Sequence, residues 1–473
     1  MAITRRQFIR RTGLATAGTL LGPSLFANPF VRRAFADLGD RYLVVIFLDG
    51  GNDGQNTVIP VTNGGGNLRN DYEAHRFAGG GGIRLTPAAL AGTLIGNDPN
   101  TGGQLALHPG FIGLKQLYDA GQLAVIQGCG YPEYSLSHDE ARTIWQSANP
   151  LRNGTLAGTG WVGRHLAATY GGSQIPAVCI SDEISSDFRQ STTSVLAIND
   201  LENFGFPWDD YGSDESAKAA AFTALYGTAS GGTPGSTQAF IGNAGAATLT
   251  STNSYPALHS NYVNDRPGFN QAYADIDRSV AYDLREVAKM IYGVSSGAPG
   301  VSARFFRLDN GGYDTHSDQG AATGQQYDLH REVGDSLKTF YDDLADMGVA
   351  DKVLTVVWSE FSRRIEQNGS GTDHGSQGPM FVVGGPTALN GGVYGNHPNI
   401  DDADLEDDGN TKYRQIAHPF RSTDFRDVFG TILKHWLNMS QPQILSNILI
   451  PDPLAGEYWN VANGINLDMG FLP

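Results

Sequence analysis

The sequence YLVVIFLDGG, residues 42–51, decides the expected fold. Its near-continuous apolar run is typical of a central strand in a parallel sheet, because helices cover both faces of such a strand. The run ends in Asp49, Gly50 and Gly51, so a carboxylate stands at the carboxyl end of a buried strand. Ligands of open α/β sheets collect at that edge. We therefore expect a site in the turn that begins at Asp49.

The rest of the chain alternates between strand and helix patterns. Apolar runs predict further strands at 123–127, 177–180, 304–308, 353–358 and 380–383, and helical periodicity predicts helices at 111–120, 138–147, 271–292, 325–347 and 424–437. This alternation favours an α/β fold, a doubly wound, mostly parallel central sheet with helices on both faces.

The N-terminus has the pattern of a twin-arginine export signal. TRRQFIR, residues 4–10, carries the arginine pair, the uncharged stretch 12–27 follows, and Ala34-Phe35-Ala36 offers a cleavage site. The stretch is too short to span a bilayer, so we expect no transmembrane anchor. The alternative is a disordered basic tail. We expect a signal peptide at 1–36 and a periplasmic or secreted mature chain, 37–473, forming a single domain.

Composition limits the partners and marks the loops. The net charge of −17 argues against nucleic acid as a partner. A Gly-, Ser- and Thr-rich insertion is expected at about 205–268, with a mobile lid or loop at 228–254, and the Asp- and Asn-rich segment 396–410 is a second excursion. Cys129 and Cys179 each end an apolar run, which favours buried free thiols over a disulfide.

Two clusters of polar residues allow a functional and a plain structural interpretation. Asp49 to Gly54, which includes Asp53, is either a glycine-rich turn that approaches a small ion or an ordinary capped tight turn. Ser137 stands just before the predicted helix at 138–147, where the positive end of a helix suits a nucleophile whose product is an anion. Taken without context, however, the position favours a plain cap of that helix.

Two further clusters supply metal-ligand chemistry. Asp314 and His316 form an Asp-x-His pair after a predicted strand, a good ligand set for a borderline metal. Glu360 follows the strand at 353–358, and Asp373 with His374 comes one loop later. No G-x-G-x-x-G or Walker sequence follows a strand, so a nucleotide site is not supported.

Together these motifs resemble a known family. They are LDGGNDGQN (48–56), YP (131–132) with SH (137–138), GWVGR (160–164), GYDTH (312–316), SEFSR (359–363) and GTDHG (371–375). In this order they resemble twin-arginine-exported bacterial proteins catalogued as domain-of-unknown-function family number fifteen hundred and one. That family is similar to the sulfatases and the alkaline phosphatase superfamily.

The resemblance implies an alkaline-phosphatase-like fold and a metal site. Members of the superfamily hold two metal ions between strand-end carboxylates and histidines, and a hydroxyl or modified Cys attacks phosphorus or sulfur. Asp49 is similar to the first-strand ligand, Ser137 to the nucleophile and His374 to the late histidine. Asp314 and His316 are similar to the ligands of one ion. The implied cofactor is one or two divalent ions: zinc, calcium, magnesium or manganese.

The sequence departs from the superfamily at Glu360 and Phe361, where catalytic members usually present Asp and then His. A phenylalanine ligates nothing. Either His138 or Asp53 supplies the missing ligand, or the protein works with one ion, or it has lost hydrolytic activity.

Three classes of function follow. The first is a metal-dependent hydrolase of phosphate or sulfate esters, with Ser137 and His138 as catalytic residues and Arg164 or Arg363 clamping the anion. The second is a degenerate member that binds a polysaccharide or a partner protein, which Phe361 favours. The third is a surface-layer or secretion component without a small ligand.

Overall fold

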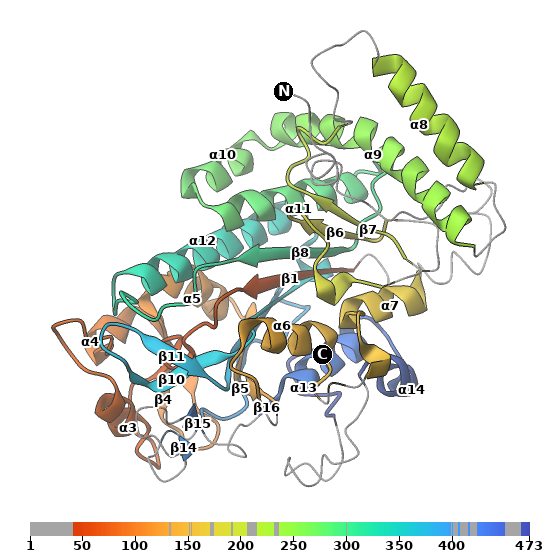
Figure 1. Ribbon diagram of the computed structural model, residues 1–473. Coiled ribbons are helices and arrows are strands. Elements are labelled where there is room, and N and C mark those ends of the chain that lie inside the picture. The colour runs from red at the N-terminus through yellow and green to blue at the C-terminus, as the bar shows by residue number, and fades with distance from the viewer. Residues whose placement is uncertain are drawn as a thin grey trace. The chain divides into compact units, whose positions relative to one another are not determined.

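The structure is a computed structural model that describes residues 41–473 with gaps (Figure 1). Outside the description lie residues 1–40, 132–133, 151, 153, 171–174, 191–192, 206–214, 231–235, 299, 399, 401–404, 407–414, 417–422 and 450–464. The predicted signal peptide at 1–36 therefore lies outside the described residues. The chain divides into two compact units. The first comprises Met1–Val44, Leu156–Asp275 and Tyr282–Leu308, and the second comprises Val45–Thr155, Ile276–Ala281 and Asp309–Pro473.

The sheet of the second unit contains the C-terminal part of the strand quoted above. Its order is β13-β5-β12-β9-β1, and β16 also pairs with β5. The bounds are β1 Tyr42–Leu48, β5 Leu123–Gly130, β9 Val353–Trp358, β12 Gly378–Gly384, β13 Gly392–Tyr394 and β16 Thr423–Asp424. β13 and β16 run parallel to β5, whereas β12 runs antiparallel to both β5 and β9. Every residue of β1 is buried, as its unbroken apolar run predicts.

Helices cover both faces of this sheet. Successive residues of a strand point to opposite faces, so two neighbouring residues show what packs on each face. On one face Trp358 of β9 stacks on Trp145 of α6, with ring centroids 5.3 Å apart. Val357, the neighbour of Trp358, pairs with Phe381 of β12, whose ring contacts Phe111 on the other face. The helices involved are α6 (His138–Ser147), α5 (Ile112–Asp119), which follows Phe111, and α12 (Gln325–Asp346), which packs on α5.

The first unit has a smaller parallel arrangement. Its order is β1-β8-β6-β7, with β8 Phe305–Asn310, β6 Ala177–Ile180 and β7 Val195–Ile198. β6 runs parallel to both β7 and β8. Its helices are α7 (Trp161–Thr169), α8 (Glu215–Ser230), α9 (Thr237–Asp265), α10 (Pro267–Ile276) and α11 (Ser279–Ser295), which begins in the second unit.

The remaining elements are short. They are α3 (Leu68–His75), α4 (Pro87–Leu90), α13 (Phe425–Thr431), α14 (Gln441–Gln443), β2 (Val58–Pro60), β3 (Leu94–Asn97), β4 (Gln104–Leu107), β10 (Ser362–Gln367), β11 (Thr372–Gly375), β14 (Leu405–Glu406) and β15 (Gln415–Ile416). β10 and β11 form an antiparallel hairpin. In the part of the chain that the structure describes, no helix has the length and apolar character needed to cross a membrane. Cys129 and Cys179 are buried free thiols.

The structure confirms the predicted α/β class and corrects two details. The predicted helix at 271–292 is interrupted after α10, where Asp277 adopts a left-handed backbone with φ 52°. The loop expected at 228–254 is instead helical in its described residues, which belong to α8 and α9. Alanines favour helix there, and the Ser236 side chain caps α9 by accepting from the Ala239 amide. Most of 396–410 lies outside the described residues, and the single mature domain stays a prediction.

Candidate metal centre

The turns after β1 and β8 approach each other closely in the second unit. The Tyr313 amide donates to the Asp49 carbonyl over 3.1 Å. Gly50 has φ +120°, and a Cβ on it would stand 2.4 Å from the Asp314 nitrogen, so no other residue fits without a shift of the backbone. The glycines of the quoted stretch thus let the Asp314 turn lie directly against the end of β1.

Asp314, His316 and His374 form what we call the metal cluster. The Nε2 atoms of His316 and His374 are 3.1 Å apart. Asp314 Oδ1 lies 3.1 Å from His316 Nε2 and 3.2 Å from His374 Nε2. The three side chains come from the turn after β8 and from β11, so residues almost 60 positions apart in the chain converge on one point.

The partners of the imidazoles leave lone pairs facing one another. His374 Nδ1 lies 2.7 Å from the Leu136 carbonyl, an acceptor only, so Nδ1 must carry the proton and Nε2 the lone pair. His316 Nδ1 lies 3.2 Å from Asp373 Oδ1, which assigns the same tautomer. Burial lowers the pKa of His374 and favours its neutral form. With the ring protons on Nδ1, the two Nε2 lone pairs and Asp314 Oδ1 face one another.

A divalent cation fits this arrangement. An ion about 2.0–2.2 Å from each ligand atom holds neighbouring ligands roughly 2.9–3.5 Å apart, in octahedral or tetrahedral geometry. The observed separations of 3.1–3.2 Å fall in that range. Metal-bound histidines usually donate their other N–H to a carboxylate or carbonyl, as His316 and His374 do here.

Asp314 is strongly ionised and shared with its neighbours. Burial opposes its ionisation, but the Arg363 guanidinium, together with His374 and His316, outweighs burial and lowers the pKa of Asp314 to about 2. Its second oxygen, Oδ2, lies 3.5 Å from His138 Nε2. Ligand atoms of His138, Asp314 and His374 all lie within 4.8 Å of one another, so His138 is a further candidate ligand.

Glu360 has a different task from the predicted metal ligand. Its fully buried carboxylate accepts the Gly50 and Gly51 amides at 3.0 and 3.2 Å and the Ser359 hydroxyl at 3.0 Å. Its Oε1 lies 2.8 Å from His138 Nδ1, and this hydrogen bond raises the pKa of His138. Glu360 therefore fixes the first turn and orients His138, because its oxygens are already engaged.

Phe361 forms a wall of the centre. Its ring centroid lies 4.9 Å from that of His138 and 4.5 Å from that of His374. A Cβ on Gly51 would stand 2.2 Å from the ring, so the turn after β1 needs glycine here too. The position where the superfamily pattern has a histidine is thus filled by an apolar ring that packs against two imidazoles.

Asp49 is paired with Arg142, a residue that was not predicted from the sequence to belong to the site. Its Oδ1 lies 2.5 Å from Arg142 Nη2, and burial raises the pKa of Asp49 despite that partner. The structure therefore does not place Asp49 in the metal cluster. Arg142 stands four residues after His138 on α6, so both side chains lie on one face of the helix. The four-residue spacing of His138 and Arg142 was the signal in the sequence that could have identified Arg142 as a residue of the site.

Two other predicted residues, Asp53 and Asp373, have structural partners that do not fit the predicted roles. Asp53 is fully buried and bidentate with Arg76, so it is no candidate ligand. Asp373 holds His316 and accepts from Asn368 at 2.6 Å, outside the cluster. Groups of the protein itself thus engage both carboxylates.

The two predicted anion clamps also have other partners. Arg363 is fully buried, and its guanidinium donates to the carbonyls of Gly50, Gly51, Tyr313 and Thr372 as well as to Asp314. It therefore pins the site's backbone and is not exposed to an anion. Arg164 belongs to the first unit and donates to Thr159, at 2.9 Å to its carbonyl and 3.1 Å to its hydroxyl.

Ser137 occupies the N-cap position of α6, yet its side chain makes no capping hydrogen bond and the residue is exposed. Ser135 is engaged instead. Its hydroxyl donates to Glu140 over 2.8 Å and accepts the Ser137 amide at 3.2 Å. Of these two serines, Ser137 is the exposed one and stands at the helix N-terminus.

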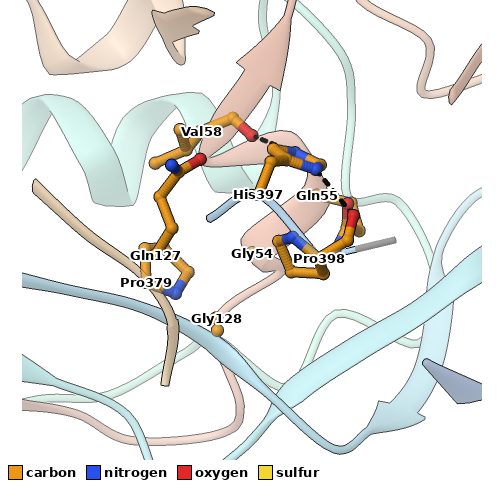
Figure 2. Close-up of a pocket in the computed structure, with 9 residues that line it drawn as sticks. Gly54, Gln55, Val58, Gln127, Gly128, Pro379, His397 and Pro398 are labelled. Carbon is orange, nitrogen blue, oxygen red and sulfur yellow. Dashed lines mark hydrogen bonds between the residues drawn. The ribbon is translucent and has the colours of Figure 1, made fainter. Parts of the chain in front are cut away.

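A separate small pocket in the same unit has a different character (Figure 2). Its only ionisable side chain is His397, whose ring nitrogens lie 2.9 Å from the Pro398 carbonyl and 3.3 Å from the Val58 carbonyl. Burial lowers the pKa of His397. With no carboxylate in its lining, this pocket offers less chemistry than the metal cluster.

A family model described as "Protein of unknown function (DUF1501)" matches residues 100–418. No curated protein matches the sequence. Among solved structures, the crystal structure of PsFucS1 sulfatase from Pseudoalteromonas sp. is similar over 77% of this chain and 68% of that chain, at 11% identity and a TM-score of 0.29. Likeness at this level carries nothing about activity.

Proposed function

Since the chain belongs to the DUF1501 family of proteins of unknown function, its activity must be inferred from its own site, and we propose that it is an exported, metal-dependent hydrolase of phosphate or sulfate esters. One observation carries the proposal. Three acceptor atoms of Asp314, His316 and His374 meet at 3.1–3.2 Å while both Nδ1 atoms are held by acceptors. Such a cluster is stabilised by a cation between its lone pairs.

We propose that Asp314, His316 and His374 hold one divalent ion. Two imidazoles and a carboxylate favour zinc or manganese over magnesium or calcium, which prefer all-oxygen sites. When bound, such an ion supplies Lewis acidity toward the oxygens of an anionic ester. Phe361 fills the adjacent space, which supports one ion over two.

The chain's own residues support ester chemistry around that point. The Ser137 hydroxyl is exposed at the N-terminus of α6, where the free amides and the helix dipole favour an anion. Arg142 lies on the same helix one turn later and is suited to bind an ester oxygen. We assign Ser137 as the nucleophile, Arg142 as the anion-binding group and His138 as a group positioned by Glu360.

The experiment combines metal content with ester hydrolysis. Purified mature protein is analysed for metals and assayed on p-nitrophenyl phosphate and p-nitrophenyl sulfate. Ser137→Ala should lower kcat by several powers of ten without changing metal content or stability. The matched control is Thr143→Ala on α6, an exposed hydroxyl that bonds only the Asp139 carbonyl among the contacts described, and it should keep full activity. Full activity in Ser137→Ala contradicts the assignment.

A second function is favoured by Phe361. A degenerate member that keeps the fold and one ion but binds a polysaccharide or a partner protein needs no complete ligand set. Metal-containing protein that hydrolyses neither ester, and whose Ser137→Ala variant behaves like the wild type, supports this alternative.

Export is tested separately. Replacing Arg5 and Arg6 by Lys should leave unprocessed precursor in the cytoplasm, because twin-arginine signals depend on the arginine pair. Processed protein in the periplasm at wild-type levels contradicts export by this route.

A further inference from the structure

The ligands of the metal cluster come from two segments that are distant in the sequence. We call residues 314–319, after β8, the ligand loop, and residues 368–375, which end in β11, the β11 segment. Asp314 and His316 belong to the loop, and His374 belongs to the β11 segment. The separation of the ligand atoms therefore depends on how these two segments are held together.

Backbone contacts bring the ligand loop and the β11 segment together. The Thr372 amide donates to the Thr315 carbonyl over 3.1 Å. The Gln319 amide donates to the Ser370 carbonyl over 3.0 Å. A Cβ on Gly371 would stand 2.4 Å from the Thr315 carbonyl oxygen, so a side chain at this position would push the two segments apart.

The side chain of Gln319 adds a second connection within this contact. Gln319 is fully buried, and so are Thr315 and Thr372 apart from 2% of Thr315. Gln319 Oε1 accepts the Thr315 hydroxyl at 3.0 Å and the Thr372 hydroxyl at 2.8 Å. One amide oxygen thus accepts from the ligand loop and from the β11 segment at the same time.

The orientation of the Gln319 amide is fixed by its other partners. Its Nε2 donates to Asp53 Oδ2 over 2.7 Å and to Gln326 Oε1 over 2.9 Å. A carboxylate only accepts, so Nε2 must face Asp53, and Oε1 must face the two hydroxyls. Arg76 holds the same carboxylate through two hydrogen bonds of 2.6 and 3.0 Å. The buried ion pair therefore orients the amide that connects the two segments.

We propose that Gln319 is a positioning residue of the metal cluster, an inference that rests on the metal binding proposed above. Each threonine that Gln319 holds lies within two residues of a cluster ligand. A shift of either threonine therefore moves ligand atoms. Held in place, the ligand atoms stand 3.1–3.2 Å apart before an ion binds, so that binding needs no rearrangement of the two segments.

The test is the zinc affinity of Gln319→Met, measured on the mature protein by competition with a chelator. Methionine has a similar length but no N–H, so it cannot connect the two hydroxyls to Asp53. Affinity should fall about 10- to 100-fold, as it does when outer-shell partners are lost. Gln55→Met is the matched control, because Gln55 is a buried glutamine of the same unit that lines the pocket of Figure 2, and it should bind zinc like the wild type.

A double-mutant cycle separates positioning from a general loss of stability. Thr315→Val combined with Thr372→Val removes both hydroxyl donors and should weaken zinc binding about as much as Gln319→Met does. Adding Gln319→Met to this pair should cause no further loss, because Oε1 then has no hydroxyl to hold. Additive losses, or zinc binding by Gln319→Met at wild-type strength, overturn the proposal.

A metal-free crystal structure keeps the inference separate from the proposed function. In Gln319→Met the Nε2 atoms of His316 and His374 should lie farther apart than the 3.1 Å of the wild type. An unchanged distance overturns the positioning role alone. Wild type that binds neither zinc nor manganese overturns the proposed metal site, and this inference with it.

Discussion

Two aspartates of the second unit, each paired with an arginine, differ in what else they touch. Asp53 is fully buried, and its oxygens are saturated by Arg76, by the Gln319 amide at 2.7 Å and by the Gln55 amide at 3.2 Å. Asp314 is 47% exposed and faces histidine lone pairs as well as Arg363. Surplus acceptors, not the presence of a strand-end carboxylate, distinguish a candidate metal centre from a structural ion pair.

The largest effect is expected from removing a cluster ligand. His374→Ala should abolish stoichiometric metal after dialysis, with a loss of affinity beyond the roughly 100-fold that outer-shell substitutions cause. His435→Gln, a histidine of the same unit outside the cluster, should keep its metal. Metal content by mass spectrometry decides, and retention of one ion per chain by His374→Ala would remove the basis of the contrast with Asp53.

Disruption of the buried pair of Asp53 and Arg76 should instead lower the stability of the fold. Asp53→Ala leaves the Arg76 charge buried without its partner, which should cost about 3–5 kcal/mol in the free energy of unfolding. Urea denaturation measures the loss. The double variant Asp53→Ala/Arg76→Met should recover part of it, because no lone charge remains. A loss below about 1 kcal/mol would mean that the pair is not the closed structural unit described.

The buried His108 should respond to pH differently from the partly exposed histidines of the metal cluster. Burial lowers the pKa of His108 from 6.5 to about 4. The folded state holds His108 neutral, so its contribution to stability is complete above about pH 6.5 and is lost as pH falls toward 4. That contribution is on the order of 3 kcal/mol.

His108→Gln provides the comparison for this pH effect. Unfolding free energies of the variant and the wild type should converge as pH falls from 7 to 4. A difference that is constant across that range contradicts the buried neutral state of His108.

The smallest effect is expected at the residue that holds a ligand. Asp373→Ala should weaken metal affinity by about 10- to 100-fold, because His316 loses the acceptor that fixes its ring and tautomer. Metal-free stability should change by less than about 0.5 kcal/mol. Asp318→Asn, two residues after His316 and at positive φ, is the control and should bind metal normally. Unchanged affinity in Asp373→Ala would place His316 outside the ligand set.

The local sequence pattern predicted the strands and the polar turns. It could not predict which of those turns carries a candidate metal ligand and which carries a structural ion pair. The unbroken apolar run at 42–48 shows a doubly covered strand, and Asp314-x-His316 shows a ligand pair. Asp49 and Asp53 look equivalent in sequence, because the arginines that engage them, Arg142 and Arg76, come from other segments. Helix α8 was likewise not predicted, because the Gly-, Ser- and Thr-rich composition of its stretch predicts a loop, although the alanines within it favour helix.

The most direct test is a crystal structure of metal-loaded protein recorded at the absorption edge of the metal. We expect one anomalous peak, about 2.0–2.3 Å from Asp314 Oδ1, His316 Nε2 and His374 Nε2. The buried pair of Asp53 and Arg76 should be unchanged beside it. A peak bound elsewhere, or none after loading with both zinc and manganese, would contradict the claim that this cluster is the metal centre.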